Sequence, residues 1–106
     1  MRNSALTTYE KYTAGKWNVR RVGNVKAFAY NDRAESKWTG GNKFTLNATN
    51  LIPEKYRPQE DFGVIVTATA GGKKCTIDIL KTGTIYIRPS EDILIDEWVT
   101  IFIPYI

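Results

Sequence analysis

The sequence predicts an all-β domain, a compact antiparallel β-sandwich or β-barrel of about seven or eight short strands. Three observations support this prediction. Short runs of β-branched or alternating residues recur along the chain, glycine-containing turn signals separate them, and no stretch shows the period of an amphipathic helix. The clearest runs lie in residues 62–88, where we expect a meander of three antiparallel strands.

Each strand of this meander has its own signal. Residues 64–69 are rich in β-branched side chains, whose restricted χ1 suits extended backbone better than a helix. Residues 75–79 and 84–88 alternate between apolar and polar side chains, as a strand with one buried face does. Gly71-Gly72 and Gly83 accept the positive φ of tight turns, so we expect them to join the strands.

The N-terminal part predicts a second hairpin. Residues 1–14 are polar and lack a clear period, so we interpret them as a connector or arm with room for one short strand. The β-domain itself is expected to span residues 15–106. Within it, residues 15–30 form two alternating runs around a turn signal at Gly23-Asn24.

Between the two hairpins we expect one strand flanked by two loops. Residues 31–41 predict a polar loop around a lone tryptophan, Trp38, and residues 43–51 alternate as a strand does. Residues 51–60 contain two prolines, which exclude a regular helix or a central strand and predict an ordered loop. Two side chains of this loop can anchor it in the core: Ile52 and Tyr56.

The last predicted strand, residues 98–106, is apolar on both of its faces. A chain of this size has one core, and one face of the strand can fill it. We expect the second face to meet another layer or another subunit, because contiguous exposed apolar patches are uncommon on monomers. Trp98, like Trp17, is expected to lie in the core.

Composition excludes several kinds of catalysis. The chain has 106 residues and no histidine, which removes Ser-His-Asp and Cys-His mechanisms and most catalytic zinc sites. Its one cysteine, Cys75, lies on an isoleucine face, where a small buried hydrophobe is favoured over a reactive thiol. The acidic loop at residues 90–97 could supply calcium ligands or a carboxylate partner for Asp78, but a solvated loop is favoured. We therefore expect no enzyme activity, no metal and no cofactor.

Charge and hydropathy limit the partners. The net charge is +4, and Lys and Arg are spread along the chain, so we expect no nucleic-acid binding. A basic nucleic-acid module stays open as a minor alternative, with an affinity that would fall steeply with salt. No apolar stretch approaches the ~20 residues of a membrane helix, so we expect no membrane insertion.

Two motifs carry a likeness to a known family. The first is residues 17–25, WNVRRVGNV, and the second combines residues 51–58, LIPEKYRP, with the meander and the closing Trp98 and Tyr105. In this order and spacing they resemble the C-terminal domains of phage tail fibre and baseplate proteins. They most resemble the head domains of receptor-binding proteins from siphophages of lactic-acid bacteria, over residues 15–106.

The resemblance implies a compact β-barrel head that forms a homotrimer and binds a host cell-wall saccharide, often phosphate-bearing, without catalysis. It also implies a place on the virion, at the tail tip or baseplate, where an N-terminal attachment region and a stalk join the head to other tail proteins. We therefore interpret the chain as a head fragment begun with an added methionine. The alternative function is a structural tail fibre or baseplate domain that binds another viral protein.

The candidate saccharide site lies on the polar face of the hairpin at residues 75–88. Its expected register places Asp78 across from Tyr86 and Thr76 across from Arg88, with opposed Cβ atoms about 5 Å apart. Asp78 is the nearest match for the acid of such heads, whereas the histidine that some relatives place beside it is missing here. The Arg88 guanidinium could pair with a phosphate in a fork geometry. The alternative is a solvated sheet face with structural Asp–Arg or Asp–Tyr contacts.

Trp38 is the remaining candidate for the saccharide site. Its ring either anchors the loop at residues 31–41 in the core or stays exposed as a platform for the ligand. The sequence leaves both interpretations open, because a single tryptophan in a polar loop serves either purpose.

Overall fold

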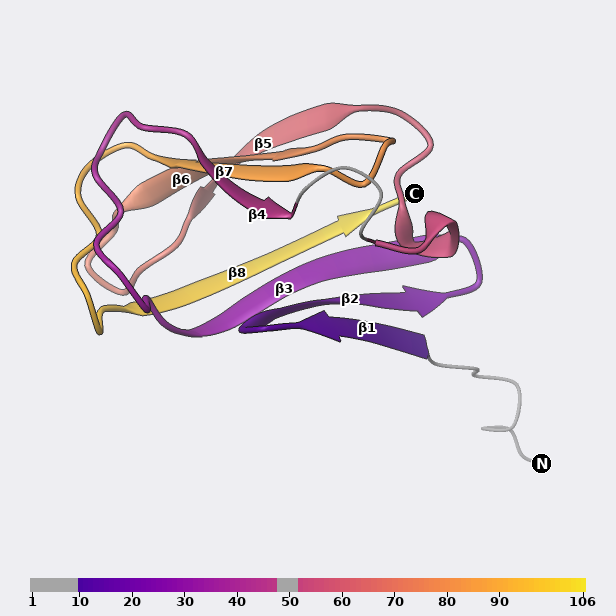
Figure 1. The fold of residues 1–106 in the computed structure, drawn as a ribbon, viewed down its shortest axis with the longest axis horizontal. Helices are drawn as coiled ribbons and strands as arrows, with labels where there is room; N and C mark the ends of the chain where they lie inside the picture. Colours follow the sequence, from indigo (N-terminus) through magenta and orange to yellow (C-terminus); the bar gives the residue numbers. More distant parts are fainter. Residues whose placement is uncertain (1–9, 48–51) are drawn as a thin grey trace.

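Eight strands form two four-stranded antiparallel sheets in the computed structural model, which describes residues 10–47 and 52–106 (Figure 1). The first sheet has the order β1 (Glu10–Ala14), β2 (Trp17–Val22), β3 (Val25–Arg33) and β8 (Trp98–Tyr105). The second sheet has the order β4 (Phe44–Asn47), β7 (Ile85–Pro89), β6 (Lys74–Ile79) and β5 (Phe62–Thr67).

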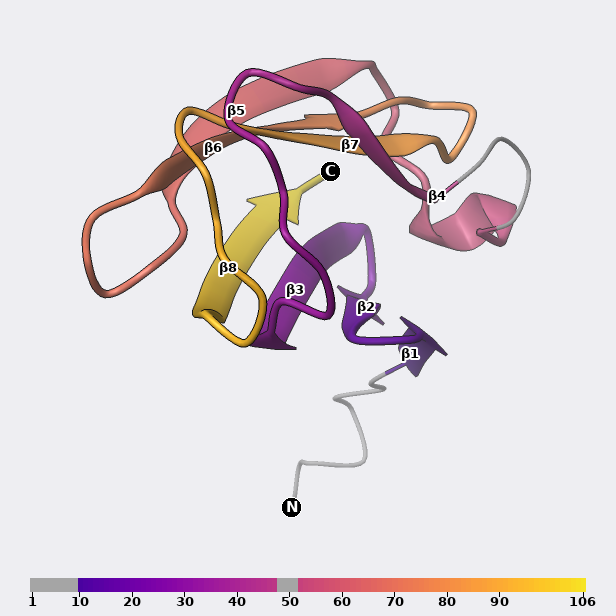
Figure 2. The same cartoon turned by 60° about the vertical axis from the view of Figure 1, so that its left-hand side comes forward.

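The all-β class is confirmed, and the architecture is the sandwich rather than the barrel. The two sheets lie one above the other as separate layers (Figure 2). Each sheet has two edge strands among the described residues, so the strands do not close into the barrel that the sequence left open.

The predicted meander is confirmed as the neighbouring strands β5, β6 and β7. Strand β5 ends at Thr67, before the end of the β-branched run. The Ala68 amide donates a hydrogen bond to the Lys73 carbonyl at 2.8 Å, so residues 68–73 already form the turn. Gly83 in the next turn has a φ of 93°, as its predicted role requires.

The N-terminal hairpin is also confirmed, with β2 and β3 joined at Gly23, where φ is 59°. Strand β3 continues to Arg33, into the segment predicted as a loop, because it pairs with β8 from Lys26 to Arg33, the partner of Trp98. Residues 10–14, within the segment interpreted as a connector or arm, form the edge strand β1. The rest of that segment lies outside the described residues.

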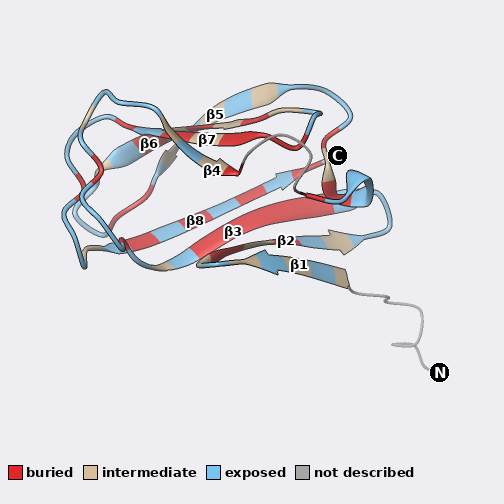
Figure 3. Cartoon of the chain, in the orientation of Figure 1, coloured by how far each residue is buried: buried red, intermediate tan, exposed pale blue. Residues whose placement is uncertain are grey.

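The core fills the space between the two sheets, where buried residues of β3, β7 and β8 face one another (Figure 3). Trp17 is buried, as predicted, but the prediction for Trp98 was wrong. Trp98 is 50% exposed, and its Nε1 donates a hydrogen bond to Asn31 Oδ1 at 3.0 Å. Its position in β8 points it to the outer face of the first sheet, because alternate residues of a strand lie on opposite faces.

Cys75 behaves as a small apolar residue of this core. Its side chain is buried, and burial raises the pKa of the thiol to about 11. The reactive thiolate is therefore scarce at neutral pH, which agrees with the interpretation favoured from the sequence.

The proline-containing loop is anchored as predicted, with Ile52 and Tyr56 buried. Its helical part is the short 3₁₀ turn η2 (Glu54–Tyr56), and the Tyr105 hydroxyl donates a hydrogen bond to the Tyr56 carbonyl at 2.6 Å. No helix within 10–47 and 52–106 is long and apolar enough to cross a membrane. Of the strand predicted at 43–51, β4 is observed, and residues 48–51 lie outside the described residues.

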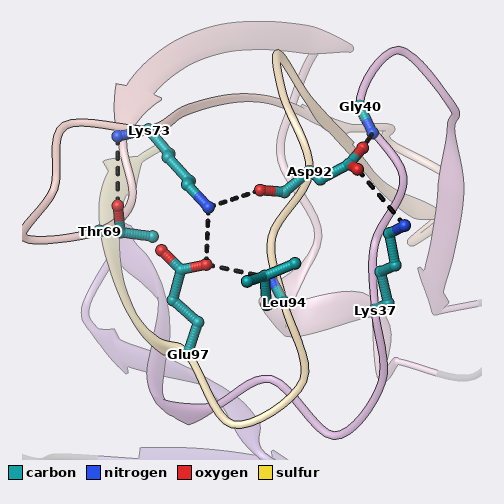
Figure 4. A network of polar contacts seen from close by, with 7 residues as sticks. All are labelled: Lys37, Gly40, Thr69, Lys73, Asp92, Leu94 and Glu97. Carbon is teal, nitrogen blue, oxygen red and sulfur yellow. Dashed lines mark hydrogen bonds and ion pairs between the residues drawn. The ribbon is translucent and has the colours of Figure 1, made fainter.

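Two carboxylates of the acidic loop hold the loops at one end of the sandwich (Figure 4). Glu97 Oε1 accepts hydrogen bonds from Lys73 Nζ at 2.9 Å and from the Leu94 amide at 3.0 Å. Lys73 Nζ also donates to the Asp92 carbonyl at 2.6 Å. The hydrogen bond from the Lys73 side chain, and then the one from the Leu94 amide, lower the pKa of Glu97.

Asp92 ties a second loop to the same end. Its Oδ1 accepts a hydrogen bond from the Gly40 amide at 2.8 Å, and its Oδ2 lies 3.4 Å from Lys37 Nζ. The Gly40 amide, and then Lys37, lower the pKa of Asp92. The acidic loop is therefore not only solvated, because its polar contacts also hold together the loops at this end of the sandwich. In the part of the chain that the structure describes, no group of three or more His, Cys, Asp or Glu could hold a metal ion.

Candidate functional site

The outer face of the second sheet gathers four of the five predicted site residues. Asp78 lies directly across from Tyr86, and Thr76 across from Arg88, in the register expected from the sequence. Thr76, Asp78 and Tyr86 are half-buried, and Arg88 is exposed. We call these four residues the polar patch.

The polar groups of the patch are available to a ligand. The side chains of its four residues make no hydrogen bond or ion pair with any other described residue. The structural Asp–Arg and Asp–Tyr contacts, which were the alternative, are therefore not observed. The carboxylate of Asp78 leans over Gly63 of β5, where a Cβ atom would collide with Asp78 Oδ1.

Tyr86 offers its hydroxyl group more than its ring. Lys43 Nζ lies over the ring, 4.2 Å from the centroid, in a cation–π contact. One face of the ring is thus covered by an ammonium group. The patch therefore presents hydroxyl, carboxylate and guanidinium groups to solvent rather than an open aromatic face.

Trp38, the fifth predicted residue, lies apart from the patch. It is 6% exposed, and its ring meets that of Tyr30 edge-on, with the centroids 5.7 Å apart. Its backbone exchanges two hydrogen bonds with Ile93, both of 2.9 Å. Trp38 is therefore a loop anchor, and its interpretation as an exposed platform was wrong.

Trp38 nevertheless lines the edge of a groove of about 510 Å³, which we call the aromatic groove. Its walls come from the start of the first sheet, from the Trp38 loop and from β4. They carry the rings of five aromatic residues: Tyr12, Trp17, Tyr30, Trp38 and Phe44. Tyr12 and Phe44 are only partly buried, so part of each side chain stays accessible to solvent.

Polar side chains also line the groove, among them Lys16, Glu35, Thr45 and Asn47. Glu35 is exposed and makes no hydrogen bond or ion pair with another described residue, whereas Lys16 Nζ donates to the Arg33 carbonyl at 2.7 Å. Burial, and then the nearby carboxylates of Glu35 and Asp32, raise the pKa of Tyr30 to about 12. Tyr30 therefore keeps its hydroxyl proton at neutral pH and can act as a hydrogen-bond donor.

Strand β4 separates the groove from the patch. Phe44 and Leu46 line the groove, while Thr45 lines its rim and pairs with Tyr86 of β7. A chain-like ligand that leaves the groove over β4 would meet Thr45 and then the patch. The two surfaces are thus neighbouring parts of one candidate site.

The sequence did not predict the groove. Its residues come from segments 12–17, 30–38 and 44–47, and no local pattern shows that these meet. One signal was available, since Tyr12 is a large ring in an otherwise polar segment. A large ring is expected to pack against other apolar side chains. The ring of Tyr12 packs against those of Trp17 and Tyr56, with centroids 6.1 and 6.0 Å away.

Comparison with protein-family models gave no match for this chain, and comparison with curated proteins gave none either. The likeness to phage receptor-binding heads therefore rests on the two sequence motifs.

Proposed function

We propose that this domain is a non-catalytic receptor-binding head of a phage tail, which attaches the virion to a saccharide of the host cell wall. The observation that carries this proposal is the aromatic groove, a concave site with rings on its walls and an exposed carboxylate, Glu35. A concave apolar site with a few polar groups is the usual form of a small-ligand site in proteins. The two sequence motifs supply the link to phage tails.

The groove and the patch offer complementary contacts to a saccharide. The C–H face of a sugar packs on an aromatic ring, which Tyr12 and Phe44 partly expose. The carboxylates of Glu35 and Asp78 can accept hydrogen bonds from sugar hydroxyls. Arg88 is the group suited to a phosphate on the saccharide, because a guanidinium forms paired hydrogen bonds with a phosphate. None of these contacts requires bond breaking.

We further propose that three copies assemble into a homotrimer through the outer face of β8. This face exposes Trp98, Phe102 and, just beyond the strand, Ile106, which are 50%, 58% and 61% exposed. Three equivalent saccharide sites would then lie on one particle. Weak binding at each site would be multiplied by effective concentration on a repetitive cell wall.

The test is a titration of the ¹⁵N-labelled domain with cell-wall polysaccharide fragments from lactic-acid bacteria, after selection on a glycan array. We expect saturable shifts of amides around the groove. Glu35→Ala should weaken binding about tenfold, the usual loss for a charged hydrogen bond. Glu60→Ala, at an exposed acid that lines neither surface, should bind as the unchanged chain does. Shifts that avoid both groove and patch, or no binding by any fragment, would contradict the proposal.

A second candidate function is a structural tail fibre or baseplate domain that binds another viral protein. The same exposed apolar face of β8 favours it, because protein contacts cover such faces. This function predicts no glycan binding and a stable complex with a second tail protein. Glycan binding by the isolated domain separates the two functions.

A further inference from the structure

One end of the sandwich carries a basic pocket that the proposed saccharide site does not use. It has a volume of about 410 Å³ and is lined by residues of β2, of β3 and of the turn between them. That turn lies on the right in Figure 1. Five cationic side chains line it, against one carboxylate, Glu54. The cations are Arg21, Lys26, Lys55, Arg57 and Lys81.

The fold concentrates charge that looks dispersed in the sequence. These residues come from β2, from β3, from the proline-containing loop and from the turn between β6 and β7. A third of the 15 Lys and Arg residues thus meet in one hollow, although the chain shows no basic cluster. Positive charges that converge on a hollow raise the local concentration of anions.

The pairing of strands places two of these cations directly opposite each other. Arg21 of β2 is the cross-strand partner of Lys26 of β3, and like charges in this position destabilise a sheet. One carboxylate is nearby, since Glu10 of β1 is the other cross-strand partner of Arg21. Its Oε2 lies 2.7 Å from Arg21 Nη1, but its Oε1 lies 2.6 Å from Lys55 Nζ. Glu10 is therefore shared by two cations and leaves Lys26 without a partner.

One buried donor of the pocket is unsatisfied, and a neighbouring cation has no partner among the described residues. Lys26 is 7% exposed and makes no hydrogen bond or ion pair with any residue in 10–47 or 52–106. Arg21 Nε is buried without a hydrogen-bond partner. Burial, and then the charge of Arg21, lower the pKa of Lys26. Such groups are costly, so each one in a native structure calls for an explanation.

We propose that this pocket binds a phosphate group, with Arg21 and Lys26 as the inner donors and Lys81 as an outer contact. A phosphate monoester carries close to two negative charges at neutral pH and has three acceptor oxygens, which matches several converging donors. A carboxylate would bring one charge, as Glu10 already does. Arg57 is held at the wall by a hydrogen bond of 2.9 Å from its Nε to the Ile52 carbonyl, which leaves its terminal nitrogens for the ligand. This inference does not depend on saccharide binding by the groove.

The experiment is a titration of the ¹⁵N-labelled chain with inorganic phosphate at constant ionic strength and neutral pH. We expect saturable shifts of the amides of Asn24 and Lys81, which chloride does not produce. Lys26→Met keeps the apolar stem of the side chain and removes the amine. It should weaken phosphate binding about tenfold or more, the usual loss for a charged hydrogen bond. Lys74→Met removes one charge from an exposed strand position outside the pocket and should leave binding within about twofold of the unchanged chain.

Two further ligands distinguish a phosphate monoester from a nucleic acid as the natural ligand: glycerol 3-phosphate and a single-stranded oligonucleotide. Binding of glycerol 3-phosphate, with the same loss in Lys26→Met, supports the proposal. Binding of the oligonucleotide alone, with a steep fall in salt, overturns it in favour of a nucleic-acid surface. An absence of saturable shifts, or an equal loss in Lys74→Met, also overturns it. If Lys26→Met fails to fold, Lys81→Met at an exposed turn position serves instead, and an unchanged affinity there counts against the pocket.

Discussion

The two outer faces of this sandwich differ in character, although both inner faces pack apolar side chains into the core. On the second sheet, the outer positions of β6 and β7 hold the polar patch. On the first sheet, the outer positions of β8 hold Trp98 and Phe102, and those of β3 hold Ala27 and Ala29. A polar face is stable in water and offers its groups to a ligand. An apolar face costs free energy until another surface covers it.

The difference arises from strand β8, which has apolar residues in both of its alternating sets. Val99, Ile101 and Ile103 fill the core, so Trp98 and Phe102 must point out. The expectation that both faces would be covered is not met within this chain, and a covering subunit stays a prediction. This face also has a small hollow of about 180 Å³, lined in part by Val25, Ala27 and Phe102, which a side chain of a partner could fill.

The largest expected effect tests the difference between inner and outer faces on one strand. Ile77→Ala, at a fully buried position of β6, should reduce the free energy of unfolding by roughly 2–5 kcal/mol. Thr76→Ala, on the outer face of the same strand, should cost less than about 1 kcal/mol. Urea denaturation with the same slope for both variants measures this. Equal losses would mean that the faces of β6 are assigned the wrong way round.

The next effect compares the two outer faces through self-association. We expect light scattering to show a homotrimer at tens of micromolar. Phe102→Ser should dissociate it, because loss of an aromatic at the centre of an interface costs about 2 kcal/mol or more. Ile65→Ser is the matched control, since Ile65 is 69% exposed on the other sheet. A clean monomer for the unchanged chain, or dissociation by both variants alike, would refute this use of the β8 face.

A smaller effect concerns ligand binding by the polar patch. Asp78→Ala should weaken saccharide binding about tenfold, because a charged acceptor is lost. The free energy of unfolding should change by less than about 0.5 kcal/mol, since Asp78 has no polar partner among the described residues. Calorimetric titration measures the saccharide affinity, and thermal unfolding of the same samples measures the change in stability. A variant that unfolds but still binds would show that Asp78 is a structural residue.

The smallest effect is a pH dependence at the basic pocket, on the inner face of the first sheet. The pKa of Lys26 is lowered in the folded state, so the unfolded state binds more protons between that pKa and the usual value of 10.5. The free energy of unfolding should therefore rise with pH in this range, relative to Lys26→Met. Burial raises the pKa of Tyr105, the cross-strand neighbour of Lys26, so above pH 10 Tyr105 lowers the stability as pH rises. Both proteins contain Tyr105, so its effect cancels from the comparison.

Chemical denaturation of both proteins across this pH range measures that difference. At pH 7 the unchanged chain carries the cost of a charged, partly desolvated Lys26 that has no partner among the described residues. Saturating phosphate should remove the difference by stabilising the charged amine. Parallel pH profiles without phosphate would show that the amine already has a favourable environment.

The local parts of this structure could be predicted from the sequence. The hairpin of β6 and β7 depends on neighbours in the chain, so alternation and a glycine turn were enough to place Asp78 across from Tyr86. The same holds for the turn at Gly23 and for the anchors Ile52 and Tyr56. In each case, a short-range pattern decides the backbone conformation, and only one face is apolar enough to be buried.

Tertiary structure alone decided which surfaces are assembled from distant segments. Strand β8 is apolar on both faces, so its sequence does not say which set of residues is buried. Pairing with β3, whose Phe28 and Tyr30 face the core, decides this and exposes Trp98. The groove and the basic pocket arise in the same way, because their residues become neighbours only when the two sheets pack. Alternation determines which residues of a strand share a face, but contacts between sheets determine what that face meets.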